Sequence, residues 1–459
     1  MSQFNMPTQV IAHAEREREQ FLNDLYEYLA IPSVSAQPEH ARDVRHAAVW
    51  LSEHLRNIGL TASVMETGGH PVVYAEWKHP EAGKPTVLVY GHYDVQPAEP
   101  FELWHSEPFK PTVRDGDIYA RGSSDNKGQH LAHIKAVESY LKTTGGLPVN
   151  VKFLIEGEEE IGGPNLGAFV AANKELLACD VVMISDSHLL TLDQPTLLYG
   201  LRGLLYFEVE ARCSAHDLHS GTYGGNVQNP AMALAQILAQ LKTDQGVVTV
   251  PGFYDDVHVL GPEERAEIAR IPQNEDTIKA ETGAPELFGE PGFNVPERMG
   301  ARPTLEVNGL WSGYTGPGAK TVLPAIANAK ISCRLVPYQD PAKIFEAVSA
   351  HMRRLTPPGT TLTFTMLQEG TRGTLIDRHA PQVQAAARAA QSTYGNPPIF
   401  TLEGGSIPVV NDFQDVLGKP IVLLGYGLPG DNLHAPDEHY AIACYEKGIE
   451  ASIRFLAEL

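Results

Sequence analysis

The sequence TVLVYGHYDVQP, residues 86–97, contains the segment around which the chain is organised. Residues 86–90 are rich in β-branched and aromatic side chains, which predicts a strand buried on both faces. The pattern breaks at Gly91, so His92 and Asp94 follow the carboxyl end of this strand, where ligands bind in open α/β sheets. A histidine followed by a nearby carboxylate suits a metal ligand and the group that orients it, although a single histidine is as often a structural hydrogen-bonding group.

The arrangement of an apolar strand followed by acidic or histidine residues recurs along the chain. The further cases are 149–155 before the acidic run EGEEE (156–160), 180–185 before Asp186, and 420–425, which lead through a Gly-Asp-Asn turn to His434. Four acids within five residues repel one another unless a cation neutralises them, although a solvated acidic loop would also tolerate them. Strand ends distant in sequence therefore bring potential metal ligands to one edge of a sheet.

Asp125 lies in the polar turn GSSDNKG, residues 122–128, directly before an expected helix. An aspartate that caps the helix or closes the turn is the ordinary explanation for this position. With the strand-end residues it gives five candidate metal ligands: His92, Asp125, Glu160, Asp186 and His434. Two histidines and three carboxylates exceed the needs of one tetrahedral zinc and suit two divalent ions bridged by one carboxylate. Zinc accepts these ligands, Mn²⁺ or Co²⁺ could replace it, and a further acid would carry a proton from water to the leaving nitrogen.

The composition is that of an ordinary globular protein, with 43% hydrophobic and 20% charged residues. The formal charge of −21 argues against a nucleic-acid or anionic-membrane partner, because both need a basic surface. The cysteines are widely spaced, which predicts free thiols in a reducing compartment and neither disulfides nor zinc ligands: Cys179, Cys213, Cys333 and Cys444. The sequence has no signal-peptide pattern and no apolar run of about 18 residues, so we expect a cytoplasmic protein.

The length of 459 residues favours two domains. Residues 9–30 and 43–58 have helical spacing of apolar groups, and with the strands above they predict an α/β domain with a mixed, mostly parallel sheet and helices on both faces. Between about 200 and 375 the pattern changes to alternating strands and two helices: 203–213, 230–241, 328–336 and 343–355. We therefore expect a smaller α+β domain, 200–375, inserted into a domain formed by 1–199 and 376–459.

Eight ordered motifs resemble those of the dinuclear-zinc peptidase family, which contains carnosinase-type cytosolic dipeptidases, aminoacylases and glutamate-releasing carboxypeptidases. The motifs are GHYDVQP (91–97), GSSDNKG (122–128), EGEEEIGG (156–163), ISDS (184–187), DLHSGTYGG (217–225), GAKTVLP (318–324), CRLVP (333–337) and EGGSIP (403–408). The resemblance runs from about residue 20 to the C-terminus and is closest to the dipeptidase branch. It implies a catalytic domain with two metal ions and an inserted lid and dimerisation domain.

The resemblance also implies the roles of the metal-site residues. One ion would be held by His92 and Asp186, the other by Glu160 and His434, with Asp125 bridging them through a cis peptide to Asn126. Asp94 would orient His92, and Glu159 would be the general acid/base that acts on a hydroxide held between the metals. The family has a pair of acids where this chain has three, so Glu158 leaves the register open, and the final motif departs from the dipeptidase form at residues 435–438.

Substrate contacts follow from the same resemblance: His219, Thr321, Arg334, Glu403 and Ser406, with the metal ligands Asp186 and His434 also facing the substrate. Arg334 lies within an apolar strand, where a charge needs a partner, and a substrate carboxylate would serve as well as a structural salt bridge. Gly404, Gly405 and Ser406 offer donors that could hold an anion. Glu403 would lie near the substrate's amino end.

The expected activity is metal-dependent hydrolysis of dipeptides or short peptides with a free C-terminal carboxylate. An N-acyl-amino-acid amidohydrolase would need the same metals, base and carboxylate clamp, but not an acid such as Glu403 for the substrate ammonium. A non-catalytic metal-binding or scaffolding protein would not need Glu159. The resemblance further implies a homodimer through the inserted domain, in which His219 acts in the neighbouring subunit's site.

Overall fold

The computed structural model describes residues 7–405, 407 and 409–459, so the expected substrate contact Ser406 lies outside the described residues. Its contacts divide the chain into two compact units. Unit 1 comprises Met1–Tyr199, Ile376–Phe400 and Pro408–Leu459, and unit 2 comprises Gly200–Leu375 and Thr401–Ile407. The short segment 401–407 thus groups with unit 2, whereas the sequence boundaries assign it to the catalytic domain, because Leu402 packs closely against Gly200 and Gly300.

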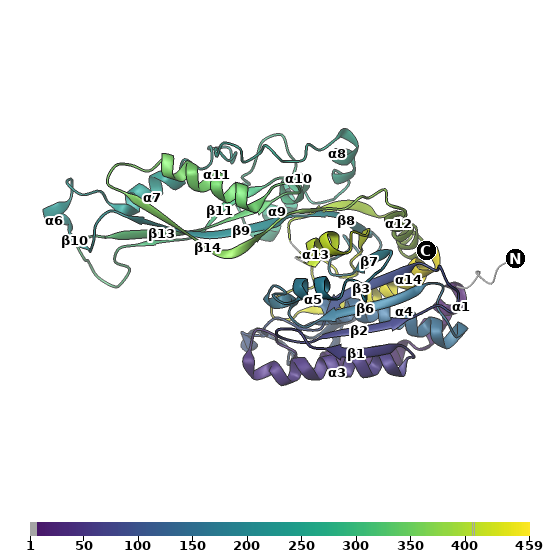
Figure 1. Cartoon of the computed structure of the whole chain (residues 1–459). Helices are drawn as coiled ribbons and strands as arrows, with labels where there is room; N and C mark the ends of the chain where they lie inside the picture. The colour runs from purple at the N-terminus through teal and green to yellow at the C-terminus, as the bar shows by residue number, and fades with distance from the viewer. Residues whose placement is uncertain (1–6, 406, 408) are drawn as a thin grey trace. The chain divides into compact units, whose positions relative to one another are not determined.

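A mixed sheet forms the centre of unit 1, which confirms the expected fold class (Figure 1). Its strand order is β1-β2-β6-β3-β7-β17-β8-β15, and β16 also pairs with β8. The strands are β1 (Thr61–Met65), β2 (Val72–Trp77), β3 (Thr86–His92), β6 (Asn150–Glu156), β7 (Val181–Ile184), β8 (Thr196–Leu201), β15 (Thr374–Leu375), β16 (Ile399–Glu403) and β17 (Ile421–Leu423), of which β15 and the carboxyl ends of β8 and β16 belong to unit 2. The neighbouring central strands β6, β3, β7 and β17 pair in parallel, and their carboxyl ends therefore meet at one edge.

Helices cover both faces of this sheet, as strand β3 shows. Val87 and Val89 line a small cavity with His133 of α4, whereas the Tyr90 ring packs edge-on against Phe413 of α13, with 5.5 Å between the ring centroids. Successive side chains of a strand point to opposite faces, so α4 and α13 lie on opposite sides. The helices of unit 1 are α1 (Pro7–Arg16), α2 (Arg18–Leu29), α3 (Ala41–Asn57), α4 (Gly128–Thr144), α5 (Leu166–Ala172), α12 (Pro381–Tyr394), α13 (Val409–Val416) and α14 (Ile442–Glu458).

Smaller elements complete unit 1. A three-stranded sheet has the order β18-β5-β4. Its strands are β4 (Thr112–Arg114), β5 (Asp117–Tyr119) and β18 (His439–Ala441), and the short helical turns are η1 (Pro38–His40), η2 (Phe101–Leu103), η3 (Ser123–Lys127) and η4 (Glu159–Ile161). None of the helices described has the length and apolar character needed to cross a membrane.

Unit 2 is built on an antiparallel sheet with the order β11-β13-β9-β14. Along β9, alternate residues are buried, and Leu205, Phe207 and Val209 enter a core that includes Leu234 of α7 and Val348 of α11. The strands are β9 (Gly203–Arg212), β11 (Thr304–Ser312), β13 (Ile326–Leu335) and β14 (Thr361–Thr371), with a separate pair β10 (Leu218–His219) and β12 (Val322–Leu323). The helices are α6 (Ser220–Tyr223), α7 (Pro230–Leu238), α8 (Pro262–Ile268), α9 (Glu275–Thr282), α10 (Val295–Gly300) and α11 (Pro341–Arg354).

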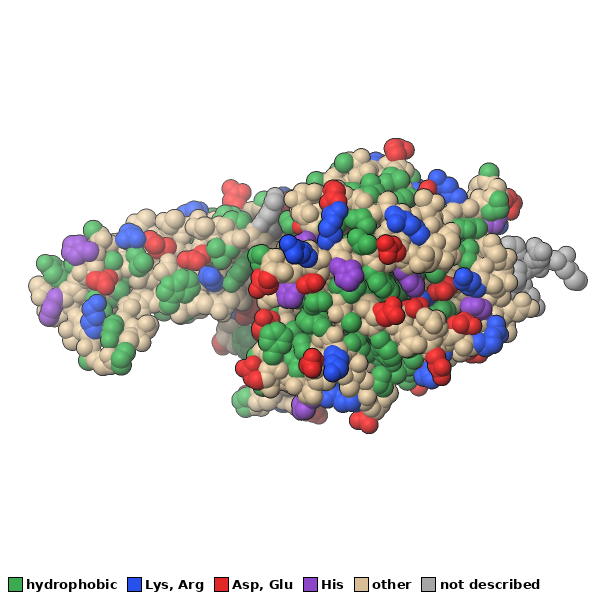
Figure 2. All heavy atoms as spheres, turned by 90° about the horizontal axis from the view of Figure 1, so that it is seen from below, with side chains coloured by type: hydrophobic (Ala, Val, Ile, Leu, Met, Phe, Trp, Pro, Cys, Tyr) green, Lys and Arg blue, Asp and Glu red, His purple; other side chains and the backbone are tan. Residues whose placement is uncertain are grey.

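The molecular surface and the cysteines agree with the composition. Acidic side chains lie interspersed with lysine and arginine on the face drawn in Figure 2, so this face carries no single-sign field of the kind that binds a polyanion. All four cysteines are free thiols, and Cys179, Cys333 and Cys444 are buried. The absence of disulfides among them confirms the prediction from their spacing.

Candidate metal centre

Gly91 allows a turn and a helix to approach the end of β3 closely. A side chain at Gly91 would place its Cβ 2.6 Å from Cβ of His130 on α4 and 2.8 Å from Oδ1 of Asn126, which is too close for any other residue. The strand continues through His92, whose side chain is fully buried. The absence of a Cβ at Gly91 therefore brings the turn that contains Asp125 against His92.

Asp125 lies between the two histidines. Its Oδ1 is 3.1 Å from Nε2 of His92, and its Oδ2 is 2.9 Å from Nε2 of His434. The peptide bond from Asp125 to Asn126 is cis, as the family resemblance implies. The backbone of Asp125 is not helical (φ −115°, ψ 93°), and its side chain caps no helix, so the ordinary explanation as an N-cap does not apply. Each carboxylate oxygen faces a different imidazole, which is the arrangement that a bridging ligand requires.

The remaining candidate ligands lie beside the histidines. Oε2 of Glu160 is 3.3 Å from Nε2 of His434, and Oδ1 of Asp186 is 3.7 Å from Nε2 of His92. Potential ligand atoms of His92, Asp125 and Glu160 all lie within 4.8 Å of one another. The structure thus brings the five candidate ligands together from five separate segments.

The donor set fits divalent cations. Nε2 of His92 is buried and has no hydrogen-bond partner among the described residues, so it is available to a metal. Burial would raise the pKa of Asp125, but its contacts with His434 and His92 hold that pKa below its usual range, and contacts with Asp125 and Glu160 raise the pKa of His434 to about 10. Burial and the neighbouring Asp125 raise the pKa of Glu160 to about 7. Without a metal, protons must neutralise part of the negative charge of these carboxylates. A bound dication would take the place of those protons.

Asp94 contacts His92 differently from the expectation. Nδ1 of His92 lies 3.0 Å from the main-chain carbonyl of Asp94 and 3.5 Å from its carboxylate Oδ1. The carboxylate instead accepts the main-chain N–H groups of Glu159 (3.2 Å) and Glu160 (3.1 Å). The chain turns after β3, and this turn directs the Asp94 carbonyl towards the His92 imidazole. The Asp94 carboxylate then binds the main-chain N–H groups that follow β6. Asp94 therefore fixes the imidazole mainly through its backbone and fixes the Glu159–Glu160 turn through its side chain.

The three consecutive acids separate into different environments. Glu158 is buried and accepts hydrogen bonds from the main-chain N–H of His70 (3.0 Å) and from Nδ2 of Asn165 (2.9 Å). Glu158 therefore has structural partners, and the register that assigns Glu159 and Glu160 to the site stays a prediction. Burial raises the pKa of Glu159 well above its ordinary value, with nearby Asp186 and Glu160 adding to the effect and His92 opposing it. Glu159 thus lies beside the cluster in surroundings that favour its protonated form.

The substrate-contact candidates on unit 2 fall into two groups, and the first lies at the short antiparallel pair of β10 and β12. His219 on β10 pairs with Val322 on β12, and both N and Oγ of Ser220 donate to the carbonyl of Thr321, at 3.1 and 3.0 Å. His219 and Thr321 are thereby brought together, and both are exposed.

The second group surrounds an arginine that the sequence analysis did not select. Arg202 donates from its main-chain N–H to the carbonyl of Glu403 (3.2 Å) and from Nε to the carbonyl of Gly404 (3.2 Å). Burial and the nearby charge of Arg334 lower the pKa of Arg202 to about 10, while Glu403 opposes this. The guanidinium groups of Arg202 and Arg334 and the carboxylate of Glu403 are therefore close enough to act on one another's charge. The sequence signal was the charge in the apolar run LYGLRGLLYF, residues 198–207.

Other residues at the centre were also missed. Nδ2 of Asn126 donates to Oδ1 of Asp186 (2.8 Å) and to the carbonyl of Ser185 (2.6 Å), so it holds a candidate ligand. Its position next to Asp125 in the GSSDNKG motif was the available signal. Glu438 accepts three main-chain N–H groups of residues 122–125, and only its place after His434 in the sequence hinted at this.

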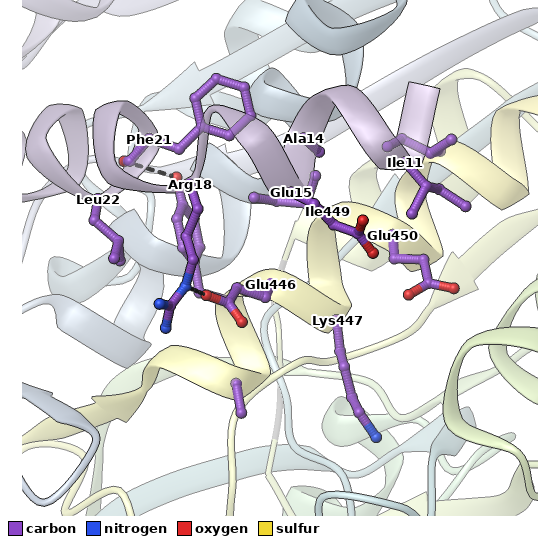
Figure 3. Close-up of a pocket in the computed structure, with 13 residues that line it drawn as sticks. Ile11, Ala14, Glu15, Arg18, Phe21, Leu22, Glu446, Lys447, Ile449 and Glu450 are labelled. Atoms are coloured by element: carbon purple, nitrogen blue, oxygen red, sulfur yellow. Dashed lines mark hydrogen bonds and ion pairs between the residues drawn. The ribbon is translucent and has the colours of Figure 1, made fainter. Parts of the chain in front are cut away.

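A separate groove of about 270 Å³ lies between α1, α2 and α14 (Figure 3). Its apolar lining includes Ile11, Phe21 and Ile449, and none of the candidate site residues contributes to it. Arg18 on its rim pairs with Glu446. Two further charges of the lining are paired, Lys447 with Asp193 at 2.8 Å and Glu450 with Arg454 at 2.7 Å. The groove therefore adds no catalytic group.

Comparison with known proteins identifies the family. The family model described as "Peptidase family M20/M25/M40" matches residues 88–458, and the chain belongs to this family. It is therefore a peptidase, and the resemblance to the dipeptidase branch is confirmed by its relatives. The chain is 30% identical over 464 residues to the Beta-Ala-His dipeptidase of Rattus norvegicus, with 97% of this chain and 94% of the relative covered. It is 32% identical over 454 residues to the Cys-Gly metallodipeptidase DUG1 of Candida albicans, with 95% and 93% covered.

A solved structure agrees over nearly the whole chain. The M20 family metallo-carboxypeptidase Sso-CP2 from Sulfolobus solfataricus superposes with a TM-score of 0.82 at 36% identity, covering 95% of this chain and 98% of that one. Human carnosine dipeptidase 1 gives a TM-score of 0.81 at 29% identity, with 99% and 98% covered. The family likeness thus includes both units of the fold.

Proposed function

We propose that this protein hydrolyses dipeptides or short peptides with a free C-terminal carboxylate at a centre of two divalent metal ions, with zinc the expected metal. The observation that carries the proposal is the position of Asp125, whose two oxygens lie 3.1 and 2.9 Å from different histidines. One ion would be held by His92 and Asp186 and the other by Glu160 and His434. The charge of three carboxylates suits two dications and one anionic ligand. A cytoplasmic location stays a prediction from the sequence.

The bound ions would polarise the scissile carbonyl and lower the pKa of a water molecule. Glu159 accepts the proton of that water as it attacks the carbonyl carbon, and then donates the proton to the leaving nitrogen. Its backbone N–H is tied to the Asp94 carboxylate at 3.2 Å, which supports a fixed position beside the ligands. Burial and the neighbouring carboxylates raise the pKa of Glu159 in the metal-free site, and the charge of the bound ions would oppose that rise and favour the carboxylate that accepts the proton.

Recognition of the free carboxylate is assigned to unit 2. Arg334 would bind it bidentately, and the adjacent charge of Arg202 supports an anion there. Glu403 would meet the substrate's ammonium group, and Thr321 and Ser406 would provide further polar contacts. This assignment favours a dipeptidase over a deacylase, because a deacylase needs a neutral or apolar pocket on the amine side.

The proposal includes a homodimer formed through unit 2, with His219 completing the partner's site. Strand β11 lies at the edge of its sheet, and its Val307, Leu310 and Trp311 are 42%, 56% and 42% exposed. An edge strand with exposed apolar side chains invites pairing with a second copy, and two-fold dimers are the commonest soluble oligomers. His219 would there stabilise the oxyanion that develops as the carbonyl is attacked.

A substrate screen on the purified protein, combined with metal analysis, tests the proposed function. The screen compares β-Ala-His and Cys-Gly, the dipeptides named in its relatives, with tetrapeptides and N-acetyl amino acids. We expect two divalent ions per chain and the highest kcat/KM on a dipeptide. Preference for tetrapeptides would instead indicate a carboxypeptidase, as in the relative from Sulfolobus solfataricus. Preference for N-acetyl amino acids would refute the dipeptidase assignment.

A further inference from the structure

A buried ion pair joins the segments that carry the candidate metal ligands. Arg121 and Glu438 are 1% and 0% exposed, and Nη1 of Arg121 lies 2.7 Å from Oε2 of Glu438. Neither residue is a candidate ligand or takes part in the proposed proton transfer. Burying two charges is unfavourable unless further hydrogen bonds satisfy them, so their other contacts indicate what the pair does.

Glu438 fixes the turn that contains Asp125. Its carboxylate accepts the main-chain N–H groups of Gly122 (2.8 Å), Ser124 (3.1 Å) and Asp125 itself (3.1 Å). Glu438 also follows His434 by four residues in the same loop. One carboxylate therefore ties the loop that carries His434 to the backbone of the proposed bridging ligand.

Arg121 connects the same pair to the loop after His92. Its Nη2 donates to the carbonyl of Pro97 at 3.3 Å and to the carbonyl of Ala435 at 3.2 Å, the residue after His434. The planar guanidinium reaches Glu438 and these two carbonyls at once, which a lysine ammonium at the same position cannot do. Arg121 itself directly precedes the turn that contains Asp125.

We propose that Arg121 and Glu438 form a positioning pair that sets the spacing of His92, Asp125 and His434 and so determines the affinity for both metal ions. This role rests on the proposed metal centre. The pair holds backbone, not side chains, so it acts by limiting the positions that the three ligands can take before a metal arrives. Groups that orient metal ligands typically contribute about 10–100-fold in affinity.

Unit 2 contains a matched control pair. Glu297 is 0% exposed, its Oε1 and Oε2 accept from Nε and Nη2 of Arg265 at 2.8 and 3.0 Å, and Oε2 also accepts the main-chain N–H of Asn294 at 2.8 Å. Both pairs join a buried glutamate to an arginine and to the backbone, but Glu297 accepts one main-chain N–H where Glu438 accepts three, and Arg265 is 46% exposed whereas Arg121 is buried. The control pair holds none of the segments with candidate ligands, so its loss tests the cost of breaking such a pair without moving the metal site.

The test measures zinc binding and stability in the full-length protein. Wild type, Glu438→Gln, Arg121→Lys and Glu297→Gln are stripped of metal, and Zn²⁺ alone is titrated against a competing chelator, with circular dichroism to verify folding. We expect Glu438→Gln and Arg121→Lys to bind zinc about 10–100-fold more weakly than wild type. Glu297→Gln should lower the melting temperature but change zinc affinity by less than about twofold, because the control pair shares no partner with the candidate ligands.

Wild-type zinc affinity in folded Glu438→Gln or Arg121→Lys would overturn the positioning role. If Glu438→Gln does not fold, the milder Arg121→Lys decides the question, since it retains the charge. An equal loss of affinity in Glu297→Gln would also overturn the proposal, because it would show a general effect of instability. Failure of the proposed metal centre is a different result, namely no stoichiometric zinc binding by wild type, and it would overturn both proposals.

Discussion

The candidate ligands of unit 1 and the candidate substrate contacts of unit 2 are held in different ways. The side chains of His92, Asp125 and Glu160 are 0%, 13% and 3% exposed, and each is bonded to neighbours from other segments. His219 and Thr321 are exposed and are held by one short strand pair. His434, whose side chain is 55% exposed, is the exception in unit 1. Residues that hold an ion need a rigid shell, whereas residues that meet a substrate must remain open to it.

The largest expected effect separates the two adjacent acids of unit 1. Glu159→Gln should lower kcat by about 10²–10⁴-fold or more while both metals remain bound, because the side chain acts on water and not on a metal. Metal analysis of the purified variant, beside its kinetics, checks this. Glu160→Gln is the matched control and should lose metal. If Glu159→Gln loses metal and Glu160→Gln retains both ions, the two roles are reversed.

A second prediction tests whether the exposed histidine of unit 2 serves another subunit. His219→Ala should lower kcat by about 10²–10³-fold, the range for loss of an oxyanion donor. Co-expression with Glu159→Gln makes about half of the dimers mixed, and each mixed dimer has one complete site if His219 acts on its partner. Activity should then return to about a quarter of wild type. Differential tags verify the mixed dimers, and no recovery in their presence rules out action between subunits.

A smaller effect is expected from the arginine of unit 2. Arg334→Lys keeps the charge but loses the planar fork, so kcat/KM for a dipeptide should fall about 10–100-fold. Dipeptide amides should be poor substrates of the wild type for the same reason. An enzyme that cleaves amides and free acids equally well would show that Arg334 does not bind the carboxylate.

The smallest effect is on stability in acid and should be confined to unit 1. Burial, and then the neighbouring Lys135, lower the pKa of His54 to about 4. The unfolded chain takes up a proton near pH 6.5 and the native state does not, so stability falls as the pH drops from about 6.5 towards 4. Between pH 7 and pH 5 this contributes about 2 kcal/mol to the loss.

His54→Gln should therefore show a smaller loss of stability between pH 7 and pH 5 than wild type, measured by urea unfolding of the metal-free protein. Tryptophan fluorescence reports mainly on unit 1, because Trp50, Trp77 and Trp104 belong to it and only Trp311 belongs to unit 2. His216→Gln, at an exposed position of unit 2, is the control. An equal pH dependence in wild type and His54→Gln would contradict the prediction.

Apolar patterning predicted the parts of the fold that are buried on both faces. Strands β3, β6 and β7 begin or end within one or two residues of the expected positions, because a continuous apolar run is a strong signal. Strands β1 and β14 were missed, although the TLTFTM stretch of β14 alternates polar and apolar residues as a half-buried strand does. The expected helix 9–30 is two helices, α1 and α2, with a break at Glu17.

The candidate ligands could be selected from sequence because each follows a strand or a recognisable turn. The residues that support them, Asn126 and Glu438, could not be, since they act through contacts with segments distant in sequence, such as that between Glu438 and Ser124, 314 residues apart. The role of Asp94 was only half predicted for a similar reason. Its spacing from His92 suggested a contact with the imidazole, but the strand end that it holds comes from β6.

The grouping of residues 401–407 with unit 2 affects how the protein can be divided. The chain passes between the units at four places: 199/200, 375/376, 400/401 and 407/408. Unit 2 is therefore not a single insertion. Joining residue 199 to residue 376 would remove Gly200 and Gly300, against which Leu402 packs, and would leave the segment 401–407 without these contacts. A minimal catalytic unit must have this segment redesigned as well, and unit 2 expressed alone must have it grafted back.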